Sequence, residues 1–337
     1  MSDRSDLAVQ RPLDEAGECW LVADIGGTHA RFGLSPAPGL VVTDVRVMRC
    51  VNHAYLHEAA HAYLDGLAGA GRLQRPRRAC FAIAGPVTGE PVRMTNHPWV
   101  IARAQVSAAL GLTELTLLND FEAIALALPA LGPGDTAAIG PSAPADVQLP
   151  MAVIGPGTGL GVALCVPSDG RWLAVATEGG HSTAVAADDF EAEVLRRVRS
   201  DFGHVSAERL LSGIGLPVLY RAIARMRGAE VLDLSAEQIT RGALDDSDAA
   251  CAATLDTFFS MLGTFAGNVA LTSGARGGVF IAGGIAQRLA DRFARSRFRE
   301  RFEAKGRYQA YMAAIATRLI TAPHGALIGA ARAIANA

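Results

Sequence analysis

The sequence has few cysteines, almost no net charge and no long apolar run. It contains five cysteines with no close pair among them: Cys19, Cys50, Cys80, Cys165 and Cys251. This scatter indicates neither a zinc site nor a disulfide framework, and free thiols are typical of a reducing compartment, so we expect a cytoplasmic protein. The net charge of −2 gives no electrostatic footprint for nucleic acid or for an anionic membrane surface.

Segments that would place the chain in or across a membrane are also missing from the sequence. No apolar run reaches the ~18–20 residues that a membrane span needs. Residues 1–18 carry mixed charges and no apolar core, which is not the pattern of a signal peptide. We expect a short disordered extension there, too short to be a DNA-binding domain. The predicted partners therefore include neither membrane nor nucleic acid.

What the chain does have is the composition of a globular protein. Its 337 residues are 50% hydrophobic and 19% charged, enough for one large domain or two medium ones with a buried core. The runs Leu21–Ile25, Ala79–Ala84 and Leu115–Leu118 resemble strands, and Phe121–Leu131 resembles a helix. This alternation predicts an α/β architecture. The Pro/Gly-rich stretch Gly132–Pro150 is expected to be a loop.

The segment Cys19–Leu34, CWLVADIGGTHARFGL, places a glycine-rich turn after an apolar run. It is not a P-loop, because no Gly-Lys-Ser/Thr follows, and it is not a dinucleotide fingerprint, because no Gly-x-Gly-x-x-Gly opens a helix. The residues Phe32, Gly33 and Leu34 fit a second strand better. The pattern predicts a strand, a glycine turn and another strand.

A second segment, Met151–Val166, repeats this pattern as MAVIGPGTGLGVALCV about 130 residues later. That separation is too long for a solenoid repeat. It suggests two related lobes facing each other, with two unrelated hairpins as the alternative. In a third glycine element, Gly278–Ala282 is expected to be a strand, Gly283-Gly284 a turn and Ile285–Arg295 a helix. A strand and glycines before a helix N-terminus can bind an anion or a nucleotide, or can be an ordinary tight turn.

Taken together, these motifs resemble the bacterial glucokinases of the actin-like ATPase and sugar-kinase superfamily. ADIGGTHARFGL resembles the family's first phosphate hairpin, LLNDF its catalytic segment and GPGTGLG its second phosphate hairpin. TEGGH and SAERLLSG resemble its sugar segments, and GGVFIAGGI its nucleotide-side segment. The motifs occur in the family's order from about residue 20 to 330. His29 departs from the family's usual asparagine, and the Cys-x-Cys-Gly cluster of the zinc-containing relatives is missing.

The resemblance implies a two-lobed, ribonuclease-H-like (actin/hexokinase) α/β fold with a central cleft. The small lobe would comprise residues 19–118 and 323–337, including a helix at His324–Ala335, and the large lobe residues 119–322. The implied activity is transfer of the γ-phosphoryl group of ATP to the 6-hydroxyl of glucose, with Mg²⁺ as cofactor. A homodimer is also implied.

Both glycine hairpins would hold the ATP phosphates through backbone N–H groups, which glycine allows to approach closely. Asp24 would orient the water shell of Mg²⁺, since this ion binds through carboxylates and phosphates while keeping several waters. The alternative for Asp24 is a cap at the end of a strand. The resemblance assigns the following residues to ATP: Asp24, Ile25, Gly26, Gly27, Thr28, His29, Gly157, Thr158, Gly159, Gly283 and Gly284.

The same comparison identifies Asp120 as the general base, which takes the proton of the sugar hydroxyl. The alternative is that Asp120 caps the following helix. Asn119 would hydrogen-bond the sugar. Glu178 and His181 would bind glucose hydroxyls, unless they belong to an ordinary surface turn.

Glu208 would reach the anomeric end of the sugar; its alternative is a solvated helical glutamate paired with Arg209. The segment Met94–Trp99, MTNHPW, matches the family but receives no role.

Two other functions stay open at this point. One is a kinase for another hexose, such as fructose, mannose or an N-acetyl hexosamine. The other is a non-catalytic sugar sensor or regulator. The second is disfavoured, because no DNA-binding domain is predicted and because a pure sensor has no need of Asp120.

Overall fold

The chain divides into two compact units. The computed structural model describes residues 18–71, 75–141, 143–245 and 247–336, so the extension expected at residues 1–18 lies outside the described part except for its last residue. By contacts, the first unit is Met1–Asp120 with Ala330–Ala337, and the second is Phe121–Gly329. The lobe boundaries given above stay a prediction.

The first unit is built on a five-stranded sheet in the order β3-β2-β1-β4-β7. Its strands are β1 (Cys19–Ile25), β2 (His29–Pro36), β3 (Thr43–Arg49), β4 (Arg78–Ile83) and β7 (Glu114–Asn119). Strands β1, β2 and β3 are antiparallel neighbours, whereas β4 and β7 run parallel to β1. The apolar run of β1 is almost entirely buried, as expected of a central strand that is covered on both faces.

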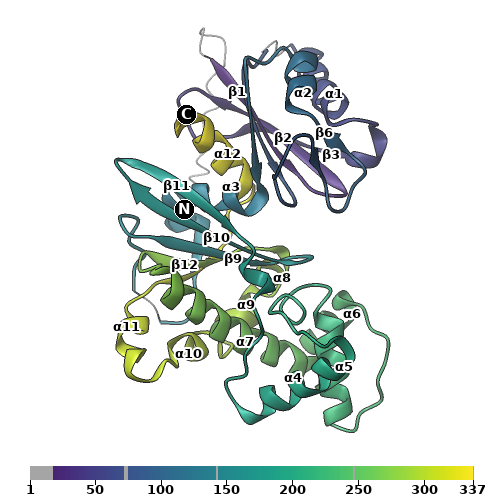
Figure 1. Cartoon of the computed structure of the whole chain (residues 1–337), viewed down its shortest axis with the longest axis vertical. Helices are drawn as coiled ribbons and strands as arrows, with labels where there is room; N and C mark the ends of the chain where they lie inside the picture. Colours follow the sequence, from purple (N-terminus) through teal and green to yellow (C-terminus); the bar gives the residue numbers. More distant parts are fainter. Residues whose placement is uncertain (1–17, 72–74, 142, 246, 337) are drawn as a thin grey trace, which may run out of the picture. The chain divides into compact units, whose positions relative to one another are not determined.

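Helices and a small hairpin complete the first unit. The helices α1 (Leu56–Ala68) and α2 (Arg103–Leu110) contact each other and lie on one face of the sheet (Figure 1). The hairpin consists of β5 (Val92–Arg93) and β6 (Val100–Ile101), and the 3-10 turn η1 (Cys50–Asn52) follows β3. Both the hairpin and η1 contribute buried residues to the core under α1.

The second unit is built on a six-stranded sheet in the order β11-β10-β9-β12-β13-β8. Its strands are β8 (Thr136–Ala138), β9 (Met151–Pro156), β10 (Leu160–Ser168), β11 (Arg171–Thr177), β12 (Gly278–Ile281) and β13 (Thr317–Ile320). As in the first sheet, three antiparallel strands precede two parallel ones. The shared order and direction of the strands in the two sheets favour two related lobes over two unrelated hairpins. The predicted α/β fold class is confirmed.

A long apolar helix, α7 (Ala249–Ser273), forms the centre of the second unit. The expectation that no apolar run reaches the length of a membrane span is wrong for this helix, which passes the length and hydropathy criteria. However, 72% of its most apolar window is buried inside the protein, as in the core helix of a globular unit. Helices α5 (Leu216–Met226), α6 (Ala236–Leu244) and α10 (Phe298–Glu303) pack on α7. Gly263 of α7 allows the close approach of α10, because a Cβ there would collide with the Phe298 carbonyl.

Three local predictions are wrong. The expected loop 132–150 contains the 3-10 turn η3 (Pro133–Asp135) and the strand β8, which pairs antiparallel with β13. The helix expected to end at Leu131 is α3 (Asp120–Ala127), which gives way to the 3-10 turn η2 (Leu128–Ala130). Pro129 in that turn lacks the N–H that a continued α-helix requires.

The third error concerns the helix expected after the glycines at 283 and 284. Two short helices, α8 (Gly284–Arg288) and α9 (Ala290–Ala294), stand in its place, separated at Leu289 with φ −111°. The helix expected near the end of the chain is α12 (Gly325–Asn336). The remaining elements are α4 (Asp189–Phe202), α11 (Gln309–Ala313) and the 3-10 turns η4 (Gly179–His181) and η5 (Gly306–Tyr308).

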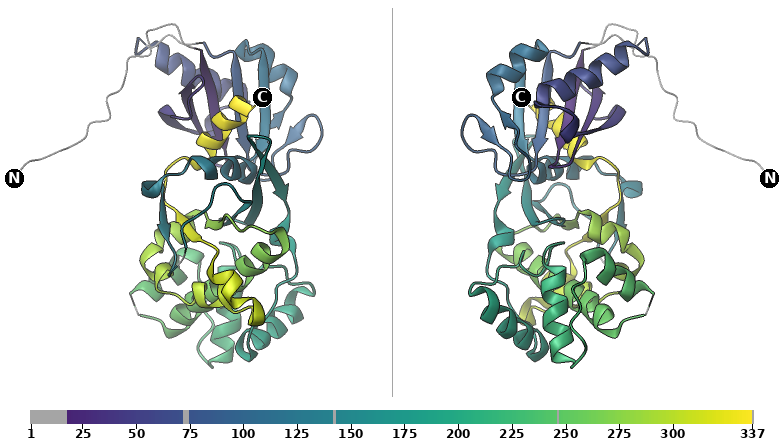
Figure 2. Two further views of the ribbon diagram at one scale, coloured as in Figure 1. Left: turned by 90° about the vertical axis from the view of Figure 1, so that its left-hand side faces the viewer. Right: turned by 90° about the vertical axis from the view of Figure 1, so that its right-hand side faces the viewer.

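Helix α12 returns the chain to the first unit. The side views in Figure 2 show this yellow helix running beside the purple and blue strands. There the Arg78 guanidinium donates a hydrogen bond to the Ile334 carbonyl at 3.1 Å. Residues distant in sequence thus complete the first unit.

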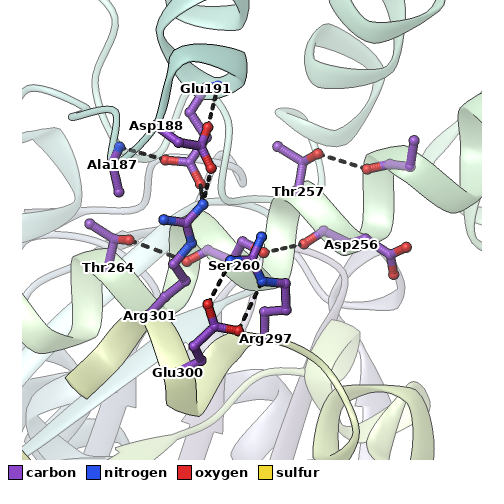
Figure 3. A network of polar contacts seen from close by, with 11 residues as sticks. Ala187, Asp188, Glu191, Asp256, Thr257, Ser260, Thr264, Arg297, Glu300 and Arg301 are labelled. Atoms are coloured by element: carbon purple, nitrogen blue, oxygen red, sulfur yellow. Dashed lines mark hydrogen bonds and ion pairs between the residues drawn. The ribbon is translucent and has the colours of Figure 1, made fainter. Parts of the chain in front are cut away.

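A buried ionic cluster joins α10 to the start of α4 in the second unit (Figure 3). The Arg301 guanidinium contacts the carboxylates of Asp188 and Glu191, the latter at 3.4 Å. Asp188 caps α4 by accepting the Glu191 backbone N–H at 2.9 Å, and the Ala187 N–H donates to Glu191 at 2.7 Å.

Burial raises the pKa of Glu191, which is 2% exposed, above its usual range. Burial also acts to raise the pKa of Asp188, but the Glu191 N–H and Arg301 outweigh it and lower that pKa.

The change Arg301→Met is expected to lower the free energy of unfolding by about 3 kcal/mol at pH 7.5, because Glu191 stays buried without its cation. The loss in the free energy of unfolding should be smaller at pH 5. Without Arg301 the folded-state pKa of Glu191 rises further above its unfolded value, so the folded state loses stability as pH rises through that interval.

Urea denaturation of both proteins at the two pH values measures this effect. The control is Arg297→Met at the N-cap of α10, which removes an ion pair to Glu300 between side chains 56% and 59% exposed. Such a pair contributes about 0–1 kcal/mol. Equal losses for the two variants would contradict a special role of the buried cluster.

Candidate active site

The first glycine motif forms the turn between β1 and β2. Asp24 pairs with Arg31 and Ile25 with Ala30 across the two strands, and the Gly26 N–H donates to the His29 carbonyl at 3.0 Å to close the turn. The predicted ATP residues of this segment are therefore consecutive positions of one tight hairpin.

Asp24 lies at the end of β1 with its carboxylate beside a cation. The Arg31 guanidinium donates to Asp24 Oδ2 at 3.0 Å, and the Asp24 side chain is 23% exposed. Among the residues that the structure describes, no group of three or more His, Cys, Asp or Glu side chains could hold a metal ion. A cation at Asp24 would depend on substrate phosphates and water for its other ligands, which fits the preference of Mg²⁺.

The segment predicted to be catalytic, residues 117–121, lies at the same edge of the first sheet as this hairpin. Ile25, Ile83 and Asn119 are in register across the parallel strands β1, β4 and β7, and neighbouring strands are about 4.8 Å apart. Asn119 is the last residue of β7 and Asp120 the first of α3, and both are partly exposed. The structure thus brings the Asp24 hairpin and the Asn119-Asp120 pair together at the carboxyl ends of the strands, where ligands bind in open α/β sheets.

Two supports of this edge were missed by the sequence reasoning. The Asn119 side-chain amide donates to the Gly85 carbonyl at 3.0 Å. Gly85 has φ +129° and contacts Thr95, and Gly27 contacts the backbone of Asn96, since a Cβ on either glycine would lie 2.8 Å from an oxygen of that neighbour. The only signal in the sequence was the segment Met94–Trp99, which matched the family without a role.

The second glycine motif forms the turn between β9 and β10, within the second unit. The Gly157 N–H donates to the Gly159 carbonyl at 2.9 Å, and the Gly157 carbonyl accepts from the Gly213 N–H at 2.7 Å. Gly213 ends the motif SAERLLSG, where no role had been assigned to it. Thr158 lies between the two glycines of the turn.

The third glycine element packs against this second hairpin. Gly283 has φ +90°, and a Cβ on it would lie 2.6 Å from the Pro156 carbonyl oxygen. Gly284 begins α8, which has only five residues. A helix this short has a smaller dipole than the expected helix over 285–295, and thus attracts an anion less. The structure explains Gly283 by close packing, and a contact of Gly283 and Gly284 with the nucleotide stays a prediction.

The three side chains expected to bind sugar come together in the second unit. His181 Nε2 lies 3.9 Å from Glu178 Oε2, and His181 Nδ1 lies 3.9 Å from Glu208 Oε1. These spacings exceed a hydrogen bond, so a ligand hydroxyl can approach a carboxylate and the imidazole at once. The side chains of Glu178 and His181 are 72% and 61% exposed.

Glu208 connects this sugar cluster to the second hairpin. Its Oε2 accepts the Leu160 N–H at 2.9 Å, and its own N–H donates to the Gly180 carbonyl at 2.9 Å. The alternative of a helical glutamate paired with Arg209 is wrong, because Glu208 lies in a turn and the Arg209 guanidinium stacks on Phe202 at 4.5 Å.

The comparisons with known proteins agree over almost the whole chain. The family model named Glucokinase matches residues 21–337. The glucokinase of Paramagnetospirillum magneticum is 47% identical over 92% of this chain and 96% of its own length, and that of Aromatoleum aromaticum is 48% identical over 94% and 95%. A crystal structure of glucokinase from an Antarctic psychrotroph, 36% identical, superposes with a TM-score of 0.87 over 95% of this chain and 99% of that one. The chain therefore belongs to the glucokinase family.

Proposed function

We propose that the protein is a glucokinase that transfers the γ-phosphoryl group of ATP to the 6-hydroxyl of D-glucose, giving glucose 6-phosphate. The observation that carries the proposal is the 47% identity to the P. magneticum glucokinase across nearly the full length of both chains. The clustering of Glu178, His181 and Glu208 supports it, because a polyol needs both hydrogen-bond acceptors and donors around it.

Asp120 is the proposed general base. It accepts the proton of the 6-hydroxyl as that oxygen attacks the γ-phosphorus in line, without a phosphoenzyme, and Asn119 hydrogen-bonds the sugar. Such a reaction depends on alignment and on neutralisation of charge more than on covalent chemistry by the protein. The Gly85 carbonyl supports this assignment, because it fixes the Asn119 amide at the strand end next to Asp120.

The two glycine hairpins are proposed to bind the ATP phosphates. Gly26, Gly27 and Thr28 with His29, and Gly157, Thr158 and Gly159, present backbone N–H groups to the anion. Bound Mg²⁺ would neutralise the phosphate oxygens, and Asp24 would hold its water shell. Arg31 keeps the Asp24 carboxylate oriented at the end of β1.

Glucose is proposed to bind through Glu178, His181 and Glu208, with Glu208 at the anomeric end. The hydrogen bond from Leu160 fixes the Glu208 carboxylate relative to the second hairpin. We further propose a cytoplasmic homodimer, in which each chain has a small lobe, residues 19–118 and 323–337, and a large lobe, residues 119–322. A coupled assay over a panel of hexoses tests the function, and a higher kcat/KM for fructose, mannose or N-acetylmannosamine than for glucose would contradict it.

The change Asp120→Asn is expected to lower kcat by ~10²–10⁴-fold, the usual contribution of a general base. Glucose affinity should change little, because asparagine keeps the shape and much of the hydrogen bonding. Steady-state kinetics and a glucose titration measure the two effects. Turnover within threefold of the wild type would assign Asp120 to capping of α3 instead.

Replacement of Glu178, His181 or Glu208 by alanine is expected to raise KM for glucose far more than KM for ATP. A site built to hydrogen-bond hydroxyls loses affinity when its partners are removed, by about 1–3 kcal/mol for each unpaired group. That corresponds to about 5- to 150-fold. Glu230→Ala, an exposed glutamate outside the cluster, is the control. A selective rise in KM for ATP would place these residues on the nucleotide side.

Removal of divalent cations by EDTA is expected to abolish phosphorylation, and added Mg²⁺ should restore it, since the metal neutralises the β- and γ-phosphate oxygens. A zinc-selective chelator should leave both activity and the unfolding transition unchanged, because the chain has no cysteine cluster for structural zinc. Stoichiometric zinc in a metal analysis, or unfolding by that chelator, would contradict this prediction.

A further inference from the structure

Cys50 makes two hydrogen bonds to the backbone of the first phosphate hairpin. This residue begins the turn η1, directly after β3. Its backbone N–H donates to the Thr28 carbonyl at 3.0 Å, and its thiol donates to the Gly26 carbonyl with Sγ 3.4 Å from the oxygen. Cys50 is fully buried, in the same core cluster as Ile25 of β1.

These two contacts determine which way the peptide groups of the hairpin point. A trans peptide is planar, so its C=O and N–H point in opposite directions. With the Gly26 carbonyl held by the Cys50 thiol, the N–H of Gly27 points away from Cys50. The Thr28 carbonyl fixes the N–H of His29 in the same manner.

This orientation matters for an anion, because an N–H attracts a phosphate and a carbonyl oxygen repels it. The peptide between Gly26 and Gly27 has glycine on both sides, and glycine adopts both signs of φ at similar cost. Side-chain sterics therefore do not prevent this peptide from turning over. An external donor to the Gly26 carbonyl supplies that restraint.

The thiol is suited to remain such a donor. Burial raises the pKa of Cys50 above its usual value, so the sulfur keeps its proton at neutral pH. The net effect of an S–H···O contact is small, about 0.5–1 kcal/mol. An effect of this size is measurable when the two orientations of a peptide differ in their affinity for ATP.

The turn η1 is itself fixed by the segment Met94–Trp99. The His53 N–H donates to the Cys50 carbonyl at 3.1 Å, and the indole N–H of Trp99 donates to the His53 carbonyl at 3.1 Å. Trp99 is 3% exposed and thus cannot shift without disturbing the core. In the same segment, the backbone of Asn96 contacts Gly27.

We propose that Cys50 is a positioning residue for the ATP phosphates. Its two hydrogen bonds keep the Gly26 and Thr28 carbonyls pointing toward Cys50 and the adjacent N–H groups pointing toward the nucleotide. Trp99 fixes the position of Cys50 through its hydrogen bond to His53. The inference rests on the proposed role of this hairpin in binding ATP. It gives the segment Met94–Trp99, which had no role, a part in phosphoryl transfer.

The change Cys50→Ala removes the thiol donor and is expected to raise KM for ATP about two- to fivefold, with KM for glucose changed less than 1.5-fold. Cys50→Ser keeps a hydroxyl donor and should return KM for ATP toward the wild-type value. The matched control is Cys19→Ala. Cys19 is buried in the same core cluster, but it begins β1, at the opposite end of the strand from the hairpin.

Titration with a non-hydrolysable ATP analogue gives a second readout, and its dissociation constant should rise by the same factor for Cys50→Ala. Trp99→Phe keeps the aromatic packing but removes the indole N–H. We expect the same selective loss of ATP affinity in this variant, which therefore tests the inference even if Cys50→Ala does not fold.

Two outcomes would overturn the inference. Equal rises of both KM values in Cys50→Ala would show a general structural defect, and identical kinetics of Cys50→Ala and Cys19→Ala would show that the thiol contact has no special effect. A wild-type protein unable to phosphorylate glucose would refute the proposed function instead. The two failures are thus distinguishable.

Discussion

The parallel register of β1, β4 and β7 is the constraint on which the chemistry proposed for the first unit depends. Because Ile25, Ile83 and Asn119 are aligned, the turn proposed to bind phosphate and the segment proposed to be catalytic emerge at one edge. A slip of one residue in β7 would turn each of its side chains to the other face of the sheet. The apolar runs that bury β1 and β4 therefore also set the positions of the polar groups at the strand ends.

In the second unit, one carboxylate has two structural tasks. Glu208 accepts a hydrogen bond from the backbone beside the second glycine turn and lies next to His181 of the sugar cluster. The proposed sugar site and the second glycine turn therefore share one side chain. Under the proposed function, glucose bound at Glu208 would therefore contact a side chain that also holds the turn proposed to bind phosphate.

The sequence predicted the parts of the fold that depend on local pattern. Strands such as β1 and β9 are apolar runs that end at glycines, and the order of motifs identified the family. The strand β8 was missed because it pairs with β13, whose residues are about 180 positions away. A Pro/Gly-rich stretch has no local pattern that indicates such a pairing. The break at Leu289 was missed because the helical pattern continues across it.

The same distinction applies to the candidate site. Asp24, Asn119 and Glu178 could be named because they stand inside short recognisable motifs. Cys50 could not, because its proposed role comes from a hydrogen bond to the backbone of a segment 24 positions away. Every residue has a backbone carbonyl, so the sequence does not indicate which carbonyl accepts a side-chain hydrogen bond. Any residue with a suitable donor can supply that bond.

The return of α12 to the first unit has a consequence for how the protein is made. The last strand of the first sheet, β7, ends at Asn119, whereas the helical residues that join this unit begin at Ala330, about 210 positions later. At translation rates of about 5–20 residues per second, the nascent sheet waits roughly 10–40 s for them. The first unit to be synthesised is therefore the last to be completed, and the surface that α12 covers stays exposed until synthesis ends.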